Sequence, residues 1–413
     1  MALIVQKFCG SSFSDPDRIR EVADQIARTR RRGDEVVVVV SAMGKETDEL
    51  IHLAEQVSGH RPGREMDMLI TAGERKATAL LCMALHAVGV EANSFTGSQA
   101  GFITDTTHTN AKILEVRAHR VRDALDAGRV PVVGGSQGVS TEHDVTFLGR
   151  GGSDTTGVAL AAALGAEVCE LYTDVSGVFT ADPRLVPAAH RMAVVSFDEL
   201  LEMTASGCPK PAMRSVEFAR NHRVRLHVRS SFTWEPGTWV VEEDSTMEQA
   251  IISAVTHDVS EAKVTVTGVP DRHGIAAKLF RHLADRDVNA DMIVQNASEH
   301  GITDISFTLP HADLATGLEV TAGLTEELGA TGVSSDADIG RVSLVGAGMK
   351  SNPGVAATVF ETLAAHHINI EMISTSAIRI SCVVRQSEVD DAVVALHDAF
   401  GLGDGQPPVA SAL

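Results

Sequence analysis

The stretch Val36-Val37-Val38-Val39-Val40-Ser41-Ala42-Met43-Gly44 places five consecutive valines directly before a serine and a glycine turn. A strand that is apolar at every position is typical of a parallel sheet covered by helices on both faces. Similar apolar runs begin at Val130 and Val168, and helical patterns separate the runs, over residues 18–32, 65–88, 110–127 and 155–164. This alternation predicts an α/β fold built as three layers around a parallel-rich sheet.

The C-terminal third of the chain contains an internal repeat. Residues 262–268 match residues 340–346, a period of about 80 residues that suits one small domain. Each copy is predicted to run strand, helix, strand, strand, helix, strand, which is the ferredoxin-like plan. The repeat is either a duplicated structural domain or, as small modules attached to a metabolic enzyme more often are, a pair of ligand sensors. The predicted domains are a catalytic domain over 1–245, two sensing modules over 262–335 and 340–402, and a flexible tail over 403–413.

Charge and cysteine content narrow the possible partners. The 413 residues include 55 acidic and 35 basic side chains, for a formal net charge of −20. Such a surface repels nucleic acid and anionic membranes, and no apolar run is long enough to span a membrane. The cysteines are scattered without metal-ligand spacing, which favours free thiols in a reducing, cytoplasmic compartment; they are Cys9, Cys82, Cys169, Cys208 and Cys382.

Two glycine-rich segments contain the residue types that phosphates and amino acids require. Residues 7–12 read Lys-Phe-Cys-Gly-Ser-Ser, and a lysine beside a tight turn offers a phosphate both charge and backbone N–H groups. Residues 149–156 read Gly-Arg-Gly-Gly-Ser-Asp-Thr-Thr. Arg150 is suited to grip a carboxylate and Asp154 to hold an ammonium group. Ser153 or Asp154 would also serve as a plain helix cap, but a cap does not need the arginine.

Three further segments are less decisive by themselves. Residues 172–184 leave a strand with one tyrosine, acidic residues and Arg184, which suits either an adenine and phosphate site or a polar turn. Ser41, with Thr47 close behind, ends the valine strand. Glu74 lies in Thr71-Ala72-Gly73-Glu74-Arg75, which is expected to open a helix, where an acid would also simply oppose the helix dipole.

Together these strings resemble the aspartate kinases of the amino-acid kinase superfamily. The matches are residues 7–12, 40–44, 69–75, 94–101, 148–156 and 172–184, and the C-terminal repeat resembles the paired ACT modules of that family. The resemblance implies ATP-dependent phosphorylation of the side-chain carboxylate of L-aspartate, giving 4-phospho-L-aspartate, the first step toward lysine, threonine and methionine. It also implies Mg²⁺ bridging the phosphates and feedback by lysine or threonine. The edge and face that a ferredoxin-like sheet leaves exposed, present twice in the chain, predict a homo-oligomer formed through the ACT modules.

The resemblance assigns roles residue by residue. Catalysis is assigned to Lys7, Arg150 and Asp154, and no residue is assigned as a metal ligand. Aspartate binding is assigned to Ser41, Thr47, Glu74, Arg150, Ser153 and Asp154. Nucleotide binding is assigned to Lys7, Gly10, Ser11, Thr173, Asp174, Phe179, Arg184 and Lys210. Effector binding is assigned to Asp271, Gly274, Ala276, Gln295, Asn369, Ile370, Thr375 and Ser376.

Two departures from the family pattern fall in the expected nucleotide site. Cys9 stands where the family has a glycine, and Pro209 stands where it has a lysine, with Lys210 one position later. These changes leave two alternatives beside an active aspartate kinase. One is a divergent paralogue that acts on a modified aspartate in a specialised pathway. The other is a weakly active homologue whose main role is regulatory.

Overall fold

The computed structural model describes residues 2–59, 63–242, 251–296, 301–347, 349, 352 and 354–403. All but Gly403 of the predicted tail lies outside these residues. The chain divides into two compact units. The first unit comprises Met1–Val178, Arg191–Thr204 and Pro209–Asp244. The second unit comprises Phe179–His190, Ala205–Cys208 and Ser245–Leu413, so it takes two short segments from the range predicted as catalytic.

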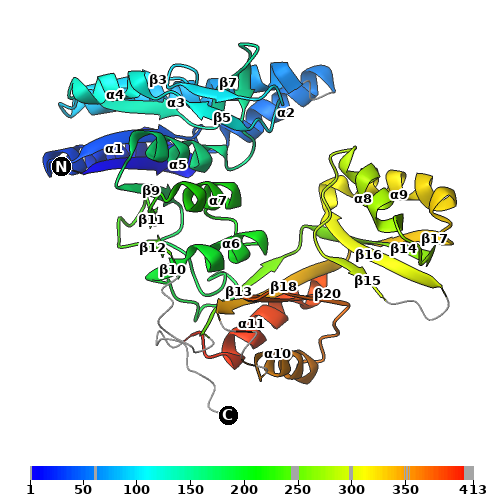
Figure 1. Ribbon diagram of the computed structural model, residues 1–413. Helices are drawn as coiled ribbons and strands as arrows, with labels where there is room; N and C mark the ends of the chain where they lie inside the picture. The colour runs from blue at the N-terminus through cyan, green and yellow to red at the C-terminus, as the bar shows by residue number, and fades with distance from the viewer. Residues whose placement is uncertain are drawn as a thin grey trace. The chain divides into compact units, whose positions relative to one another are not determined.

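The first unit is built on one eight-stranded sheet, as the valine run predicted (Figure 1). The strand order is β10-β12-β11-β9-β1-β2-β6-β3, and every neighbouring pair is parallel except β11 and β12. The bounds are β1 Leu3–Phe8, β2 Glu35–Val40, β3 Ala92–Phe95, β6 Val130–Gly134, β9 Val168–Thr173, β10 Val194–Ser196, β11 Leu226–Ser230 and β12 Thr238–Val241.

Helices cover both faces of this sheet. On one face, Val36, Val38 and Val40 pack in a core with apolar side chains of α1 and α3. On the other face, α5 packs on β1, and its Gly157 lies against the Lys7 side chain. All five valines are fully buried, as expected for a strand covered on both faces. The helices are α1 Pro16–Arg31, α2 Glu46–Ser58, α3 Gly63–Ala87, α4 His119–Asp126, α5 Gly152–Leu164, α6 Phe197–Ala205 and α7 Met213–His222.

The helix predicted over residues 110–127 was wrong in its first part. Residues Ile113–Val116 form strand β5, and α4 begins only at His119. The strand pairs with β4 (Phe102–Thr104) in a small sheet that also contains β7 (Gln137–Ser140) and β8 (Val145–Phe147). Ile113 and Val116 are β-branched, and pairing with β4 outweighs the helical pattern of the surrounding sequence.

The second unit contains two four-stranded antiparallel sheets, each with two helices of its own repeat (Figure 1). The first sheet has the order β15-β16-β14-β17 and confirms the ferredoxin-like plan for the first repeat. Its elements are β14 Glu261–Pro270, α8 Ile275–Ala284, β15 Ile293–Gln295, β16 Ile302–Pro310, α9 Leu314–Leu328 and β17 Gly332–Asp336.

The second repeat departs from the predicted order in its last strand. Its own segment supplies β18 Ile339–Ala347, α10 Gly354–Ala365, β19 Met372–Thr375, β20 Arg379–Arg385 and α11 Val389–Ala399. The fourth strand of its sheet is β13 (Ile251–Asp258), which precedes the first repeat and pairs antiparallel with β18. Within the described residues of the whole chain, no helix is long and apolar enough to cross a membrane.

Candidate active site

The candidate site is built where three adjacent parallel strands end. Lys7 is the penultimate residue of β1, Ser41 follows β2, and Gly134 ends β6. Because β1, β2 and β6 are neighbours in the sheet, their carboxyl ends meet at one edge, which is where open α/β sheets bind ligands. Lys7 and Ser41, which the family resemblance assigned to the site, therefore lie at the same edge of the sheet.

A buried ion pair forms the centre of this edge. The Nζ atom of Lys7 lies 2.6 Å from Oδ1 of Asp154, and the two residues are 5% and 6% exposed. Burial lowers the pKa of Lys7, but the carboxylate of Asp154 and neighbouring Cys9 outweigh this effect and raise it overall. Lys7 is therefore a protonated ammonium. Asp154, predicted to hold a substrate ammonium, here holds the ammonium of Lys7, and its Oδ2 accepts from Ala212 N at 3.1 Å.

Glycines allow the loops around this pair to pack closely. The Oγ atoms of Ser41 and Ser153 are 2.8 Å apart. A Cβ atom on Gly135 would lie 2.6 Å from Cβ of Ser153, and one on Gly10 would lie 2.7 Å from the carbonyl oxygen of Ala42. Only glycine fits at these two positions, so the hydroxyls of Ser41 and Ser153 are held beside the Lys7 strand.

Glu74 lies near the middle of α3 rather than at its start, so the prediction that its segment opens a helix was wrong. The side chain is 3% exposed, and a Cβ atom on Gly134 would lie 3.3 Å from its Cβ. Burial raises the pKa of Glu74 to about 7, against backbone hydrogen bonds that lower it, and the charge of Glu46 raises it further. Its buried Oε2 has no hydrogen-bond partner among the described residues. The Glu74 carboxyl group therefore titrates near neutral pH and has one oxygen left to bind a ligand.

The other predicted substrate residues do not converge on the buried pair. The Arg150 side chain is 89% exposed, and its Nη2 lies 3.1 Å from Oδ1 of Asp48. Thr47 is half-buried beside Asp48 on α2. Both belong to the first unit, and an exposed arginine on a glycine loop is free to reorient toward a bound carboxylate.

Part of the predicted nucleotide site comes together around Lys210. Its ammonium forms an ion pair with Asp174, so the loop after β9 and the loop before α7 meet. Thr173 closes the turn after β9, because its hydroxyl donates to Val175 O and accepts from Val175 N. Gly10 begins a short 3₁₀ helix, and the Oγ of Ser11 lies 3.0 Å from Sγ of Cys9.

Two predicted nucleotide residues belong to the second unit. Phe179 is half-buried there, and Arg184 binds the carboxylate of Asp182 through its Nε at 3.0 and 3.1 Å. Their roles toward a nucleotide stay predictions.

The predicted effector residues occupy the ends of elements in both repeats. Gly274 precedes α8 with φ of 91°, and Gln295 ends β15. Thr375 ends β19 in the second repeat, and Ile370 packs against the core of that repeat. The remaining positions are exposed or half-buried and adjoin these ends, namely Asp271, Ala276, Asn369 and Ser376.

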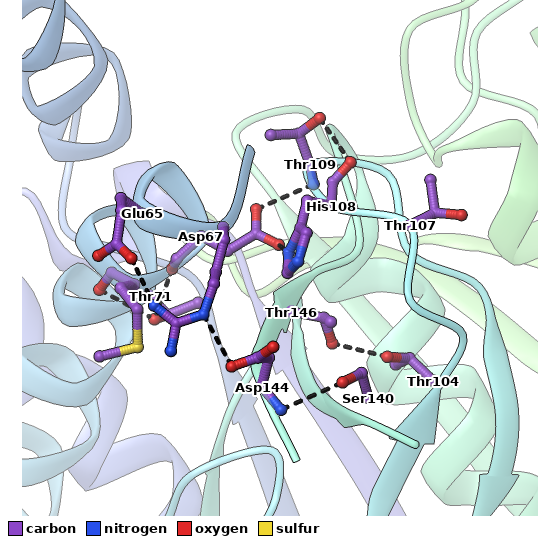
Figure 2. A network of polar contacts seen from close by, with 12 residues as sticks. Glu65, Asp67, Thr71, Thr104, Thr107, His108, Thr109, Ser140, Asp144 and Thr146 are labelled. Carbon is purple, nitrogen blue, oxygen red and sulfur yellow. Dashed lines mark hydrogen bonds and ion pairs between the residues drawn. The ribbon is translucent and has the colours of Figure 1, made fainter. Parts of the chain in front are cut away.

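Sequence reasoning missed the residues that support the glycine loop carrying Arg150. Arg214 donates to the carbonyl oxygens of Leu148 and Ala111, both at 2.9 Å. Figure 2 shows a second support, in which fully buried Asp67 binds Nδ1 of His108 at 2.8 Å and the backbone N–H of Thr109 at 2.9 Å. Burial raises the pKa of Asp67 against these hydrogen bonds.

These two supports act on the same short segment. A Cβ atom on Gly149 would lie 3.0 Å from Oδ1 of Asn110, so the Asp67 contacts fix the loop on which Gly149 rests. Asp67 and His108 are 41 residues apart in the chain, and no local pattern signals that they meet. No group of three or more His, Cys, Asp or Glu side chains suited to a metal ion occurs among the described residues.

Family models match both parts of the chain. The amino acid kinase family model matches residues 2–230, and the ACT domain model matches residues 264–321 and 342–400. The first match covers the large sheet except β12, and it covers the site at the sheet's edge. The second covers most of both repeats but omits β13, the strand that completes the second sheet.

Relatives and solved structures match along nearly the whole chain. An aspartokinase of Mycolicibacterium smegmatis is 56% identical over 100% of this chain and 99% of its own. The crystal structure of aspartate kinase from Synechocystis shares 44% identity and covers 98% of this chain and 71% of its own, with a TM-score of 0.55. Escherichia coli aspartokinase III, at 24% identity, shares the fold with a TM-score of 0.83 over 96% of this chain and 99% of its own. The chain therefore belongs to the amino acid kinase family, as an aspartokinase with two C-terminal ACT domains.

Proposed function

We propose that the aspartokinase reaction of this chain takes place at the strand edge that carries the Lys7–Asp154 pair. This reaction transfers the γ-phosphoryl group of ATP to the side-chain carboxylate of L-aspartate. The observation that carries the proposal is a lysine kept protonated in a buried position at the carboxyl edge of the sheet, beside closely packed glycine loops. Such a site binds and neutralises phosphate oxygens.

Catalysis of this reaction requires the protein to position the substrates and to neutralise charge, and it requires no general base. The substrate carboxylate is already a nucleophile, so no proton has to be removed before it attacks phosphorus. Lys7 neutralises charge that spreads onto the transferred phosphoryl oxygens, and Asp154 fixes the direction of its ammonium. Ser41 and Ser153 offer hydroxyl donors at the same edge.

Two side chains are proposed to hold the aspartate itself. Ionised Glu74 takes the α-ammonium, and Arg150 turns from Asp48 to the α-carboxylate. Asp174 and Lys210 are proposed for the nucleotide side. Mg²⁺ would supply charge neutralisation on the phosphates.

Both alternatives from the sequence lose support. The structure of E. coli aspartokinase III contains aspartate and ADP, and the M. smegmatis relative matches end to end with 56% identity. The changes at Cys9 and Pro209 leave the Lys7–Asp154 pair and the Lys210–Asp174 pair intact. We therefore expect aspartate itself to be the phosphoryl acceptor.

Hydroxylamine trapping tests this proposal directly, because it converts an acyl phosphate into a hydroxamate. Purified full-length protein with Mg·ATP and L-aspartate should yield aspartyl hydroxamate, and Lys7→Met should lose activity by about 100-fold or more. Arg64→Gln, on the exposed start of α3, is the matched control and should keep full activity. Absence of hydroxamate from protein that binds ATP would refute aspartate as the acceptor.

We further propose that the ACT domains bind lysine or threonine and that the chain works in the cytoplasm. E. coli aspartokinase III has been solved with lysine and aspartate bound, which supports an amino-acid effector for this fold. Dose–response inhibition by each amino acid, repeated with Thr375→Ala and Asn369→Ala, checks the effector and its residues. Unchanged inhibition in both variants would remove these positions from the effector site.

The ACT domains are also the proposed surface for assembly into a homo-oligomer. The two sheets end in edge strands β15 and β17, and β13 and β19, and an edge strand presents unpaired backbone groups to another chain. Light scattering at micromolar concentration should therefore give a mass above the 43.7 kDa of one chain. A single monomeric species would contradict the proposal.

A further inference from the structure

A cavity lies in the first unit, on the opposite side of β1 from the proposed active site. Its volume is about 280 Å³, and its wall includes Arg28 and Arg32 of α1 and Glu170 and Tyr172 of β9. Lys7 faces α5, whereas the neighbouring Gln6 faces this cavity's side and binds Glu170. None of the residues proposed for catalysis lines the cavity.

The buried side of the cavity contains Glu170, an anion whose charge and hydrogen-bonding oxygens are already paired with groups of the protein. Glu170 accepts hydrogen bonds from Gln6 Nε2 at 2.8 Å, the Tyr172 hydroxyl at 3.0 Å and Arg229 Nη1 at 2.9 Å. Burial would raise the pKa of Glu170, but His227, Arg229 and Gln6 overcome it and lower the pKa to about 2. Glu170 therefore stays ionised with its charge compensated, and it does not call for a bound cation.

The rim of the cavity carries two arginine side chains that form no ion pair with any described residue. Arg28 and Arg32 are four residues apart on α1, so their side chains lie on one face of the helix. In the described part of the chain, neither guanidinium has an ion pair or hydrogen bond. Asp34 also lines the cavity, but its carboxylate accepts from Ala2 N at 3.2 Å and balances one charge at most. Two guanidiniums that make no ion pair among the described residues therefore face one hollow, in a chain of net charge −20.

A basic last turn also opposes the helix macrodipole, which is the simplest explanation for arginines at this end. Arg30 and Arg31 already meet that need, and Arg30 additionally donates to the carbonyl oxygens of Asp34 and Gly128. The dipole explains neither the cavity nor its aromatic wall of Tyr172 and Trp234, whose ring centroids are 5.5 Å apart.

We infer that this cavity is a second ligand site, which takes a small molecule bearing a carboxylate or phosphate between Arg28 and Arg32. The body of the ligand would lie against Trp234, which packs on the fully buried ring of Tyr172. The site adjoins the proposed catalytic strand, because the Tyr172 ring stacks on Phe8 at 4.6 Å and Tyr172 O accepts from Cys9 N at 3.1 Å. Tyr172 therefore lies between the bound anion and the loop that follows Lys7.

The chain provides its own reporter for this site. It contains two tryptophans, Trp234 in the cavity wall and Trp239, which stacks on His227 at 3.9 Å. In the full-length Trp239→Phe protein, Trp234 alone reports by fluorescence. Titration with potassium phosphate and with malonate, at ionic strength held constant with chloride, should give a saturable change.

The charge dependence of this change separates the site from nonspecific binding. Adding Arg28→Gln and Arg32→Gln should weaken the apparent affinity by about tenfold or more, since two charge-assisted contacts are lost. Adding Arg20→Gln and Arg31→Gln removes the same charge from α1 outside the cavity and should leave the affinity unchanged. The melting temperature and the rate of aspartate phosphorylation of each variant establish that it is folded. If the Arg28→Gln, Arg32→Gln double variant does not fold, Arg32→Gln alone replaces it, because Arg32 lies at the exposed end of α1.

Each outcome decides the inference. Saturation with phosphate alone supports a phosphate-bearing ligand, and saturation with malonate as well extends the class to carboxylates. No saturable change with either probe would overturn the inference. An equal loss of affinity in the two double variants would overturn it too, because long-range charge would then explain the binding.

Discussion

Glu74 offers the sharpest test of the proposed aspartate site, because its charge should change near neutral pH. The residue is 3% exposed, and burial raises the pKa of its carboxyl group to about 7. Below that pH the group is a neutral acid and cannot pair with the ammonium of aspartate. Above it the group is an anion and can. The KM for aspartate should therefore fall as the pH rises through 7.

The size of the effect follows from the ionised fraction. With a pKa of about 7, roughly a tenth of Glu74 is ionised at pH 6 and roughly nine tenths at pH 8. The KM for aspartate should then be about tenfold higher at pH 6 than at pH 8, equivalent to about 1.4 kcal/mol. The KM for ATP should not follow the same curve, because Glu74 is proposed to contact only the amino acid.

Glu74→Gln keeps the shape of the side chain and removes its titration. This variant should show a high aspartate KM, about tenfold or more above wild type at pH 8, and no dependence on pH through Glu74. Glu65→Gln, on the exposed first turn of the same helix, is the matched control and should keep the wild-type profile. The assay is coupled ADP release at saturating ATP from pH 6 to 8.5. A wild-type KM that is flat across this range, or a slope that survives in Glu74→Gln, would refute the assignment.

Three further predictions address other contacts. Arg150→Ala should raise the KM for aspartate by about tenfold or more and change the KM for ATP little. Asp48→Ala should leave both KM values nearly unchanged, since the exposed Arg150–Asp48 ion pair contributes little free energy. Equal effects of the two variants would remove Arg150 from the site. Lys210→Ala should raise the KM for ATP or lower kcat by about tenfold, and an effect below about twofold would mean that this loop does not serve the nucleotide. Arg341→Met should destabilise the second unit by about 3–5 kcal/mol, because Arg341 is 1% exposed and its loss leaves Glu261 and Asp291 uncompensated. Urea unfolding measures this loss, with Arg281→Met at an exposed position as the control. An equal loss of stability in the two variants would contradict the prediction.

The large sheet could be predicted because its signal is local. Five buried valines in a row leave no polar face, so the strand at 36–40 has to lie inside a covered sheet. The segment 110–127 has no such signal, since its first residues gain their partners from Phe102–Thr104 in another strand. The place of β13 beside β18 also depends on residues about 90 positions apart, and the repeat pattern itself suggested a different last strand.

The candidate site divides in the same way. Lys7 and Asp154 were predicted from the residue types of two glycine-rich turns and Ser153 from the family resemblance, and the structure brings all three to one edge. The raised pKa of Glu74 was not predictable, because it arises from burial between α3 and Gly134. Arg214 and Asp67 act on backbone groups of distant loops, and such contacts leave no sequence spacing to detect.

The position of β13 affects how this region can be made and engineered. Because the first ACT repeat is inserted between β13 and the rest of the second sheet, a ribosome must release all of residues 251–385 before that sheet can close. A chimera that exchanges only residues 340–402 would join foreign β18, α10, β19, β20 and α11 to a native β13. Deleting the first repeat would leave β13 to find β18 across a new linker. Residues 251–402 should therefore be moved between homologues as one cassette, with its ends at β13 and α11.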